Sequence, residues 1–225
     1  AVNANFVFPY PETVDPVQAG GMPIVFLTAY HLLKSRGRME PGHTVLIQAG
    51  ASGVGTIAIQ LARAWGARVI ATASTQEKLD LCRSLGADVT INYTTHDFEE
   101  IVGQESGGLG VELVLECVGG PVLEKSVRCV APYGRLVSYG NASGTPANLP
   151  ASDITTANRT VIGFSIGRSP QGQLDHQAAM AELFPMLAEG KAKLVVDQIL
   201  PMSEVSKAHQ HLANRGTRGK VILTP

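Results

Sequence analysis

The feature that most constrains the fold is a turn of small residues, Ala49–Gly55 (AGASGVG), set between two segments of different periodicity. The segment before it, Thr44–Gln48, is a short apolar run typical of a buried strand. The segment after it, Gly53–Trp65, carries apolar residues at helical spacing. A strand that passes through a tight turn directly into a helix is the first half of a strand–helix–strand crossover, which joins parallel strands.

The same alternation of strand and helix continues along the chain. A capping box, Ser74 with Glu77, predicts the start of a second helix, and Gly86 predicts its end. The strand runs are mostly apolar without strict alternation, as expected when helices cover both faces of a sheet. We therefore predict an α/β fold, a Rossmann-type doubly wound parallel sheet with crossover helices. Further strands are expected at residues 68–72, 89–92, 111–116 and 135–139, and helices at 74–85, 97–102 and 121–130.

The turn has the residue types of a dinucleotide site. Such a site needs a glycine for the tight turn, a small residue where the backbone approaches the pyrophosphate, and a glycine where helix and sheet pack closely. Gly50 and Gly55 match the first and third positions, whereas Ser52 replaces the second glycine. No lysine follows Gly55, so the Walker A pattern of ATPases does not fit. A plain glycine-rich turn without a nucleotide remains the alternative.

The end of the second predicted strand bears on which nucleotide binds. NAD sites usually place Asp or Glu there to bind the ribose 2′-hydroxyl. Here the strand ends in Ala71-Thr72-Ala73 without an acid. Ser74 can donate to a phosphate and Lys78 adds a positive charge one helical turn later, a pairing that favours NADP over NAD. The alternative is that Ser74 only caps the helix and that Lys78 is a solvated surface charge.

Short motifs in a fixed order run along nearly the whole chain. They are Leu27–Tyr30 (LTAY), Ala49–Gly55, Lys78, Leu85–Asp88 (LGAD), Ile91–Tyr93 (INY), Cys117–Gly120 (CVGG), Gly140–Gly144 (GNASG) and Arg218–Leu223 (RGKVIL). Each motif alone is weakly specific. Together they resemble the medium-chain dehydrogenase/reductase superfamily, in its zinc-independent quinone oxidoreductase and enoyl reductase branch.

The resemblance implies NADPH as the cofactor and assigns residues to it. It identifies no catalytic residue, since hydride transfer belongs mainly to the cofactor while the protein aligns it and excludes water. For Tyr93 and Phe164 the alternative is an ordinary core aromatic. Carried over residue by residue, the family pattern places the pyrophosphate at Ser52, Gly53, Val54 and Gly55, the adenosine 2′-phosphate at Ser74, Lys78 and Tyr93, a cofactor ribose at Val118 and Gly119, and the nicotinamide end at Thr28, Gly140, Asn141, Phe164 and Ser165.

The resemblance also implies how the chain is divided. Members of the family begin with a GroES-like catalytic domain, and this chain starts after most of it. The apolar segment Thr160–Ile166 is expected to add an edge strand, through which a homodimer forms in relatives. Further helices are expected at 24–33, 174–188 and 203–214 and a last strand at 220–223. We expect residues 1–22 to be a connector from the missing domain, 23–168 the dinucleotide-binding Rossmann domain, and 169–225 helices and a terminal strand that return toward the catalytic domain.

We therefore expect an NADPH-dependent oxidoreductase of the quinone oxidoreductase or enoyl reductase type. Hydride would pass to a small molecule, either a quinone or an activated double bond such as an α,β-unsaturated carbonyl, and this chain would be mainly the cofactor-binding domain. Two alternatives stay open: an isolated NADPH-binding module without catalysis, and the enoyl reductase portion of a multidomain synthase.

Composition argues against several other classes. The 18 Lys and Arg nearly balance the 19 Asp and Glu, so a net charge of −1 gives no field that would attract nucleic acid or an anionic membrane. No apolar run is long enough to span a bilayer. Cys82, Cys117 and Cys129 lack zinc-site spacing and are expected to be small buried hydrophobes in a reducing, cytoplasmic protein. His209 and His211, two apart on a helix, make a poor metal pair, so no metal is expected.

Overall fold

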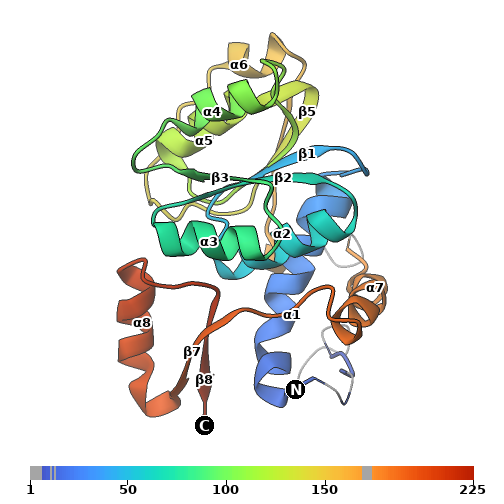
Figure 1. The fold of residues 1–225 in the computed structure, drawn as a ribbon, viewed down its shortest axis with the longest axis vertical. Coiled ribbons are helices and arrows are strands. Elements are labelled where there is room, and N and C mark those ends of the chain that lie inside the picture. The colour runs from blue at the N-terminus through green and yellow to red at the C-terminus, as the bar shows by residue number, and fades with distance from the viewer. Residues whose placement is uncertain (1–6, 11, 13, 169–173) are drawn as a thin grey trace.

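The central sheet has six parallel strands (Figure 1). The computed structural model describes residues 7–10, 12, 14–168 and 174–225. The order across the sheet is β3-β2-β1-β4-β5-β6. Successive strands are thus added on one side of β1 up to β3 and on its other side from β4 onward, so the winding of the chain reverses between β1 and β4. This is the order of doubly wound dinucleotide-binding sheets, so the predicted fold class is confirmed. The strands are β1 (Thr44–Ile47), β2 (Arg68–Ala73), β3 (Val89–Asn92), β4 (Val111–Glu116), β5 (Val130–Ser138) and β6 (Thr160–Gly163).

Helices cover both faces of this sheet (Figure 1). Alternate strand residues point to opposite faces: Val45 and Ile47 of β1 join one apolar cluster, and Leu46 joins the other. Burial on both faces explains why the strands are apolar without alternation. On one face lie α1 (Pro16–Tyr30), α2 (Gly53–Ala64) and α3 (Gln76–Ser84), and on the other α4 (Phe98–Glu105), α5 (Gly120–Arg128) and the short α6 (Ala151–Thr155).

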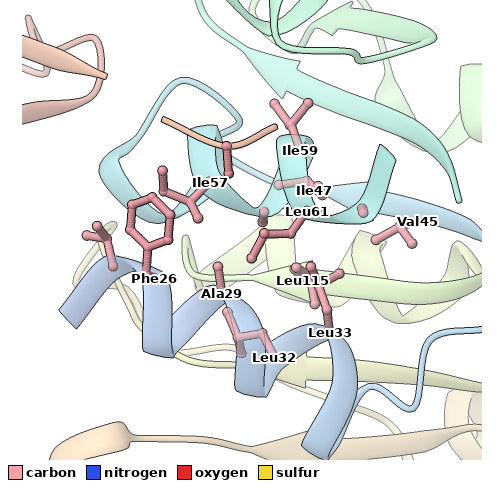
Figure 2. Packing of buried hydrophobic residues seen from close by; sticks show 14 of the residues in the cluster. Phe26, Ala29, Leu32, Leu33, Val45, Ile47, Ile57, Ile59, Leu61 and Leu115 are labelled. Carbon is pink, nitrogen blue, oxygen red and sulfur yellow. The ribbon is translucent and has the colours of Figure 1, made fainter. Parts of the chain in front are cut away.

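The larger cluster lies where α1 and α2 pack against each other and the sheet (Figure 2). Phe26 of α1 and Leu33, in the turn that continues α1, meet Ile57 and Leu61 of α2 together with residues of the strands. These four side chains are fully buried. Each contributes about 1.5–3 kcal/mol through removal of its apolar surface from water. Apolar burial therefore holds this helix pair on the sheet. Among the described helices, none combines the length and apolar character needed to cross a membrane.

Helix α1 begins earlier than predicted. The side chain of Asp15 accepts hydrogen bonds from the backbone N–H groups of Val17 and Gln18 at 3.0 and 3.1 Å, and Pro16 occupies the first helical position. Residues 16–22 are thus helical, which corrects the predicted helix start at residue 24, whereas their role as a connector stays a prediction. The glycines and Pro23 resemble turn signals, but the helix packs across them: a Cβ at Gly21 would lie 2.8 Å from Leu194 Cδ2, so glycine allows this approach. Residues 1–6, 11 and 13 of that connector lie outside the described residues.

Two other predicted boundaries are wrong. Helix α3 is capped by Thr75, whose hydroxyl accepts from the N–H of Lys78 at 3.4 Å, and not by Ser74. Val130 does not end a helix but begins β5, because it pairs with Val111 of β4. The end signal was right: Gly86, with a φ of +110°, follows α3. Pairing with a distant strand thus overrides the local helical pattern at Val130.

The last part of the chain forms a second, small sheet. Strands β7 (Val196–Pro201) and β8 (Lys220–Thr224) pair in parallel, joined by the 3₁₀ turn η4 (Met202–Glu204) and α8 (Val205–Ala213). Strand β7 was not predicted, because polar residues interrupt its apolar pattern and its register shifts between Val196 and Gln198. A two-stranded sheet is marginal alone. Residues 169–173 of the predicted third part lie outside the described residues, and the domain boundaries stay a prediction.

A buried histidine joins α7 (His176–Ala188) to the end of α1, which continues as a π-helical turn, η2 (His31–Arg36). His31 is 1% exposed. Its Nδ1 lies 2.8 Å from Ser35 Oγ, and its Nε2 lies 3.0 Å from His176 Nδ1. Burial, with smaller contributions from His176 and Arg36, lowers the pKa of His31 to about 4. The ring is therefore neutral at pH 7.

Acid should weaken the fold through His31. Because its native pKa lies below the unfolded value of about 6.5, the unfolded chain binds more protons between the two, and stability falls as the pH drops through this window. Between pH 7 and pH 4.5 the free energy of unfolding of the wild type should fall, and about 2–3 kcal/mol of this fall should be absent in His31→Gln. Urea unfolding at both pH values measures the difference. His209→Gln, an exposed position on α8, is the control and should keep the wild-type dependence. If His31→Gln keeps the wild-type dependence of stability on pH, His31 is not the group whose protonation weakens the fold.

Candidate functional site

A cavity of about 340 Å³ opens at the carboxyl edge of the sheet, where the strand order reverses between β1 and β4. Ligands of open α/β sheets bind at this position. The cavity brings together residues from the glycine turn, from the ends of β2 and β3, from the segments after β4 and β5, and from the C-terminal segment. It is lined by Ala49, Ala51, Ser52, Ala73, Ser74, Lys78, Tyr93, Val118, Ala142, Leu212, Ala213, Arg215 and Thr217.

The glycine turn packs directly against the first turn of α2. A Cβ at Gly55 would lie 2.5 Å from the carbonyl oxygen of Ala49 and 2.7 Å from that of Gly50, so only glycine fits without a shift of the backbone. Ser52, in the place of the second motif glycine, caps α2: its Oγ accepts from the N–H of Gly55 at 3.1 Å. The N-terminus of α2, with its N–H groups and the positive end of its dipole, is thereby brought to the cavity.

Two cationic residues meet at the other side of the cavity. Lys78 Nζ donates to the backbone carbonyl of Arg215 at 2.6 Å, although 137 residues separate them in sequence. Both residues line the cavity, and its lining contains no Asp or Glu. Ser74 lines it as well, directly before the Thr75 cap, so the interpretation of Ser74 as the helix cap is wrong. Sequence reasoning missed Arg215, because nothing in the local pattern links this loop to α3.

Tyr93 and Phe164, each of which could be a cofactor contact or a core aromatic by sequence, have different surroundings. Tyr93 is 37% exposed and lines the cavity, so it is not a core aromatic. Phe164 is buried in the large apolar cluster and also lines a second cavity. The core interpretation therefore holds for Phe164, without excluding contact with a ligand.

The second cavity, of about 540 Å³, lies at the carboxyl ends of β5 and β6. It brings together three residues that were assigned to the nicotinamide end, Gly140, Phe164 and Ser165. Its other lining residues are Arg36, Ser138, Tyr139, Gly163 and Arg168. Since Ala142 lines the first cavity, the segment after β5 runs between the two. Thr28 is buried on α1 and lines neither cavity, and the same absence from both linings applies to Gly53, Val54, Gly55, Gly119 and Asn141.

The turn after β4, Cys117–Gly120, is held from two sides. Glu116, the last residue of β4, accepts at Oε1 from the N–H groups of Val118 and Gly119, at 2.6 and 2.9 Å. On the other side the Asn141 side-chain amide, when oriented so that its nitrogen faces the surrounding acceptors, donates to the carbonyl oxygen of Val118 at 3.3 Å. Gly119 has a φ of +79°, and a Cβ there would lie 2.1 Å from the Asn141 side-chain amide. This grip fixes Val118 at the wall of the first cavity.

Tyr30 and Lys34 have the Tyr-x-x-x-Lys spacing of a catalytic pair, but their geometry is structural. The hydroxyl of Tyr30 donates to Glu182 of α7 at 2.9 Å, and Lys34 pairs with the same carboxylate and lies over the Trp65 ring, 4.2 Å from its centroid. Burial, followed by the hydrogen bond to Glu182, raises the pKa of Tyr30 to about 12. A proton donor with so high a pKa is poorly matched to catalysis near pH 7. The pair ties α7 to α1.

The cysteines have the environment of inert thiols. Cys82 and Cys129 are buried, and desolvation raises the pKa of each to about 12; the pKa of the partly exposed Cys117 is raised to about 11. All three are free and protonated at neutral pH. His211 pairs with Asp197 at 2.6 Å. Within the described ranges no three or more His, Cys, Asp or Glu side chains cluster as a metal site would require.

The amino-acid sequence matches the model of one known family. The model of the family described as "Zinc-binding dehydrogenase" matches residues 53–189, which run from the start of α2 to the end of α7. The chain belongs to this family. Its membership in the medium-chain dehydrogenase/reductase superfamily, inferred from the motifs, is confirmed.

Curated relatives place the chain in the quinone oxidoreductase branch. It is 34% identical over 219 residues to a 2-haloacrylate reductase of a Burkholderia species, covering 94% of this chain and 64% of the relative. It is 34% identical over 216 residues to the quinone oxidoreductase of Pseudomonas aeruginosa, covering 96% of this chain and 66% of the relative. The chain thus spans slightly less than two thirds of the length of these relatives, and it matches the portion that carries the dinucleotide fold.

Solved structures show the same fold. The Escherichia coli quinone oxidoreductase complexed with NADPH superposes with a TM-score of 0.92 at 31% identity, covering 99% of this chain and 69% of that chain. A quinone oxidoreductase of Thermus thermophilus, solved alone and with NADPH, superposes with a TM-score of 0.87 at 36% identity, covering 97% of this chain and 69% of that chain. The parallel sheet and its flanking helices are therefore shared with dehydrogenases of this branch.

The two glycines at the start of α2 should respond in opposite ways to an added methyl group. In Gly55→Ala the Cβ would meet two carbonyl oxygens below 3 Å, so we expect a loss of about 1–3 kcal/mol in unfolding free energy from the forced backbone shift. In the control, Gly53→Ala, the nearest atom is Val25 Cγ1 at 3.4 Å, so stability should hold or rise by about 0.4–1 kcal/mol. Chemical denaturation of both variants measures this difference. Equal losses would contradict the role of Gly55 in close packing.

Proposed function

We propose that this chain is the cofactor-binding part of an NADPH-dependent oxidoreductase that transfers hydride to a quinone or to an activated double bond. One observation carries the choice of cofactor. The cavity at the carboxyl edge holds Ser74 with the cations Lys78 and Arg215, and no acid lines it. Such a pocket favours a 2′-phosphate, whereas a carboxylate would favour the free ribose hydroxyls of NAD.

The residues of the site fit a bound dinucleotide. The N-terminus of α2 and Ser52–Gly55 would hold the pyrophosphate, since Gly55 brings the helix close to the turn. Ser74, Lys78 and Tyr93 would hold the adenosine 2′-phosphate, and the contact of Lys78 with the Arg215 carbonyl brings the two cationic residues to one wall. When bound, the cofactor supplies the hydride. Several relatives are named quinone oxidoreductases or a 2-haloacrylate reductase, which supports these two classes of acceptor.

The second cavity supports a position for the nicotinamide end. Gly140, Phe164 and Ser165 line it next to the grip of Asn141 on the Val118 turn, and Val118 and Gly119 would contact the ribose on that side. Thr28 is buried on α1 and lines neither cavity, so its assignment to the nicotinamide end rests on the family pattern alone. The role of the chain here is to orient the ring and exclude water.

The decisive experiment is turnover by the full-length protein that carries this chain. We expect oxidation of NADPH in the presence of a panel of quinones and α,β-unsaturated carbonyls, measured as the loss of reduced-cofactor absorbance. No turnover across both panels would overturn the oxidoreductase proposal. Tight NADPH binding without turnover would instead favour an isolated binding module.

Removal of one cation should separate the two cofactors. Lys78→Ala should weaken NADPH binding by about 1.5–3 kcal/mol, the value of a charge-assisted contact, and leave NADH binding nearly unchanged. Calorimetry with both cofactors measures this. Lys207→Ala, an exposed lysine paired with Glu204 at 2.9 Å on α8, is the control and should change neither affinity. Equal losses for NADPH and NADH in Lys78→Ala would show that the lysine does not contact the 2′-phosphate.

The setting of the protein is also part of the proposal. Strand β6 is the outer strand of the sheet, and its outer edge supports a homodimer that pairs these edges. The three free, protonated thiols support a reducing, cytoplasmic location. The mass of the full-length protein by light scattering tests the dimer.

A further inference from the structure

Glu116 has a feature that cofactor binding alone does not explain. The residue is 0% exposed at the carboxyl end of β4. Its Oε1 accepts from two backbone N–H groups, those of Val118 and Gly119. Its Oε2 is equally buried and has no hydrogen-bond partner among the described residues. A buried carboxyl oxygen without a partner is rare in folded proteins and needs a physical reason.

The surroundings of Glu116 leave its charge uncompensated. Burial raises the pKa of Glu116 above its ordinary value, against the opposing effect of the Gly119 and Val118 N–H groups, which donate to the ionised form. A proton on Oε2 would have no acceptor among the described residues, so the hydrogen bonds present serve the carboxylate form. The titratable groups that face it are the Cys117 thiol and the Tyr139 hydroxyl. Desolvation raises the pKa of Cys117 to about 11 and that of Tyr139 well above 10, so both are neutral at pH 7. Among the described residues, no cationic side chain lowers the pKa of Glu116.

The position of this carboxylate connects it with both cavities. Val118, which it holds, lines the first cavity, and Tyr139, whose backbone N–H donates to the Glu116 carbonyl at 2.9 Å, lines the second. Glu116 therefore lies beneath the segment that separates the two halves of the site. It has this position because β4 and β5 pair in parallel and end together, with Glu116 opposite Ser138.

We propose that Glu116 is a positioning residue that holds the Cys117–Gly120 turn and biases the site toward the oxidised cofactor. The inference rests on the proposed function. An oxidised nicotinamide ring carries a positive charge that the reduced ring lacks, so a fixed negative charge in a low-dielectric interior lowers the free energy of bound NADP⁺ relative to NADPH. In the reaction the acceptor gains the hydride with its electron pair, and a proton from water completes its reduction. The cofactor is left as NADP⁺, the form that the carboxylate stabilises.

The test is the ratio of two dissociation constants in the full-length protein. Glu116→Gln keeps the shape of the side chain and an oxygen for the two N–H groups but removes the charge. We expect the ratio of Kd for NADP⁺ to Kd for NADPH to rise about threefold or more, through weaker NADP⁺ binding. Calorimetry gives both constants without turnover. A tenfold change would correspond to about 30 mV in the potential of the bound couple.

The same strand offers a matched control. Glu112 is also a carboxylate that accepts a backbone N–H, that of Thr44 at 2.8 Å, but it lies at the opposite end of β4. The two positions are four residues apart along the strand, which is about 13 Å. Glu112→Gln should therefore leave the ratio at the wild-type value. A shift of equal size in both variants would overturn the proposal, because the effect would not depend on proximity to the site.

The remaining outcomes are also decisive. An unchanged ratio in Glu116→Gln, or equal weakening of both cofactors, would show a purely structural role and overturn the bias. If that variant does not fold, the wild-type ratio is measured against pH: it should rise as Glu116 is protonated, and the 2′-phosphate titration cancels because both cofactors share it. A ratio independent of pH down to acid unfolding would overturn the proposal. A wild-type protein that binds neither cofactor would instead refute the proposed function itself.

Discussion

The close approach of α2 to the turn before it determines the arrangement at the carboxyl edge of the sheet. With no side chain at Gly55, the helix begins in contact with the carbonyl groups of Ala49 and Gly50. Ile47, the last residue of β1, pairs with Ala71 of β2 and with Leu115 of β4, so the three strands run to the same edge of the sheet. The groups that follow these strands then meet around a single cavity.

The cavity is completed by a segment from far along the chain. The N–H of Gly219 donates to the carbonyl of Ala51 at 2.8 Å, and Gly219 also bridges to Ser52. These contacts bring the loop after α8 over the glycine turn, where the Arg215 carbonyl meets Lys78. The C-terminal segment is thus anchored on the same turn that begins α2. It contributes directly to the site as well as to the small sheet beside it.

Sequence patterns predicted the parts of the molecule that depend on neighbouring residues. The strands at 89–92 and 111–116 and the glycine end of α3 follow from local apolar runs and turn chemistry, and the structure has them as expected. Local signals also produced the errors. Gly20, Gly21 and Pro23 indicated a turn, but the cap at Asp15 and the packing of Leu194 against Gly21 allow a helix.

The features that the sequence did not reveal depend on distant pairing. Strand β7 has too mixed a pattern to be recognised without its partner β8. Arg215 comes to Lys78 only through the fold, and the unpartnered oxygen of Glu116 exists only once β4 is buried between β1 and β5. The fold class could therefore be predicted from short-range patterns, whereas the walls of the site could be predicted only in part.

The anchoring of Gly219 on Ala51 and Ser52 has a consequence for the order of events during protein synthesis. A ribosome makes a chain from its N-terminus at roughly 5–20 residues per second, and segments fold as they emerge. The six strands of the central sheet end at Gly163, so this sheet has all its strands before the loop that carries Arg215 has been made. The nascent chain therefore has the strands of its central sheet while the cavity at the carboxyl edge is still open. Closure of that cavity waits for the last residues of the segment described here.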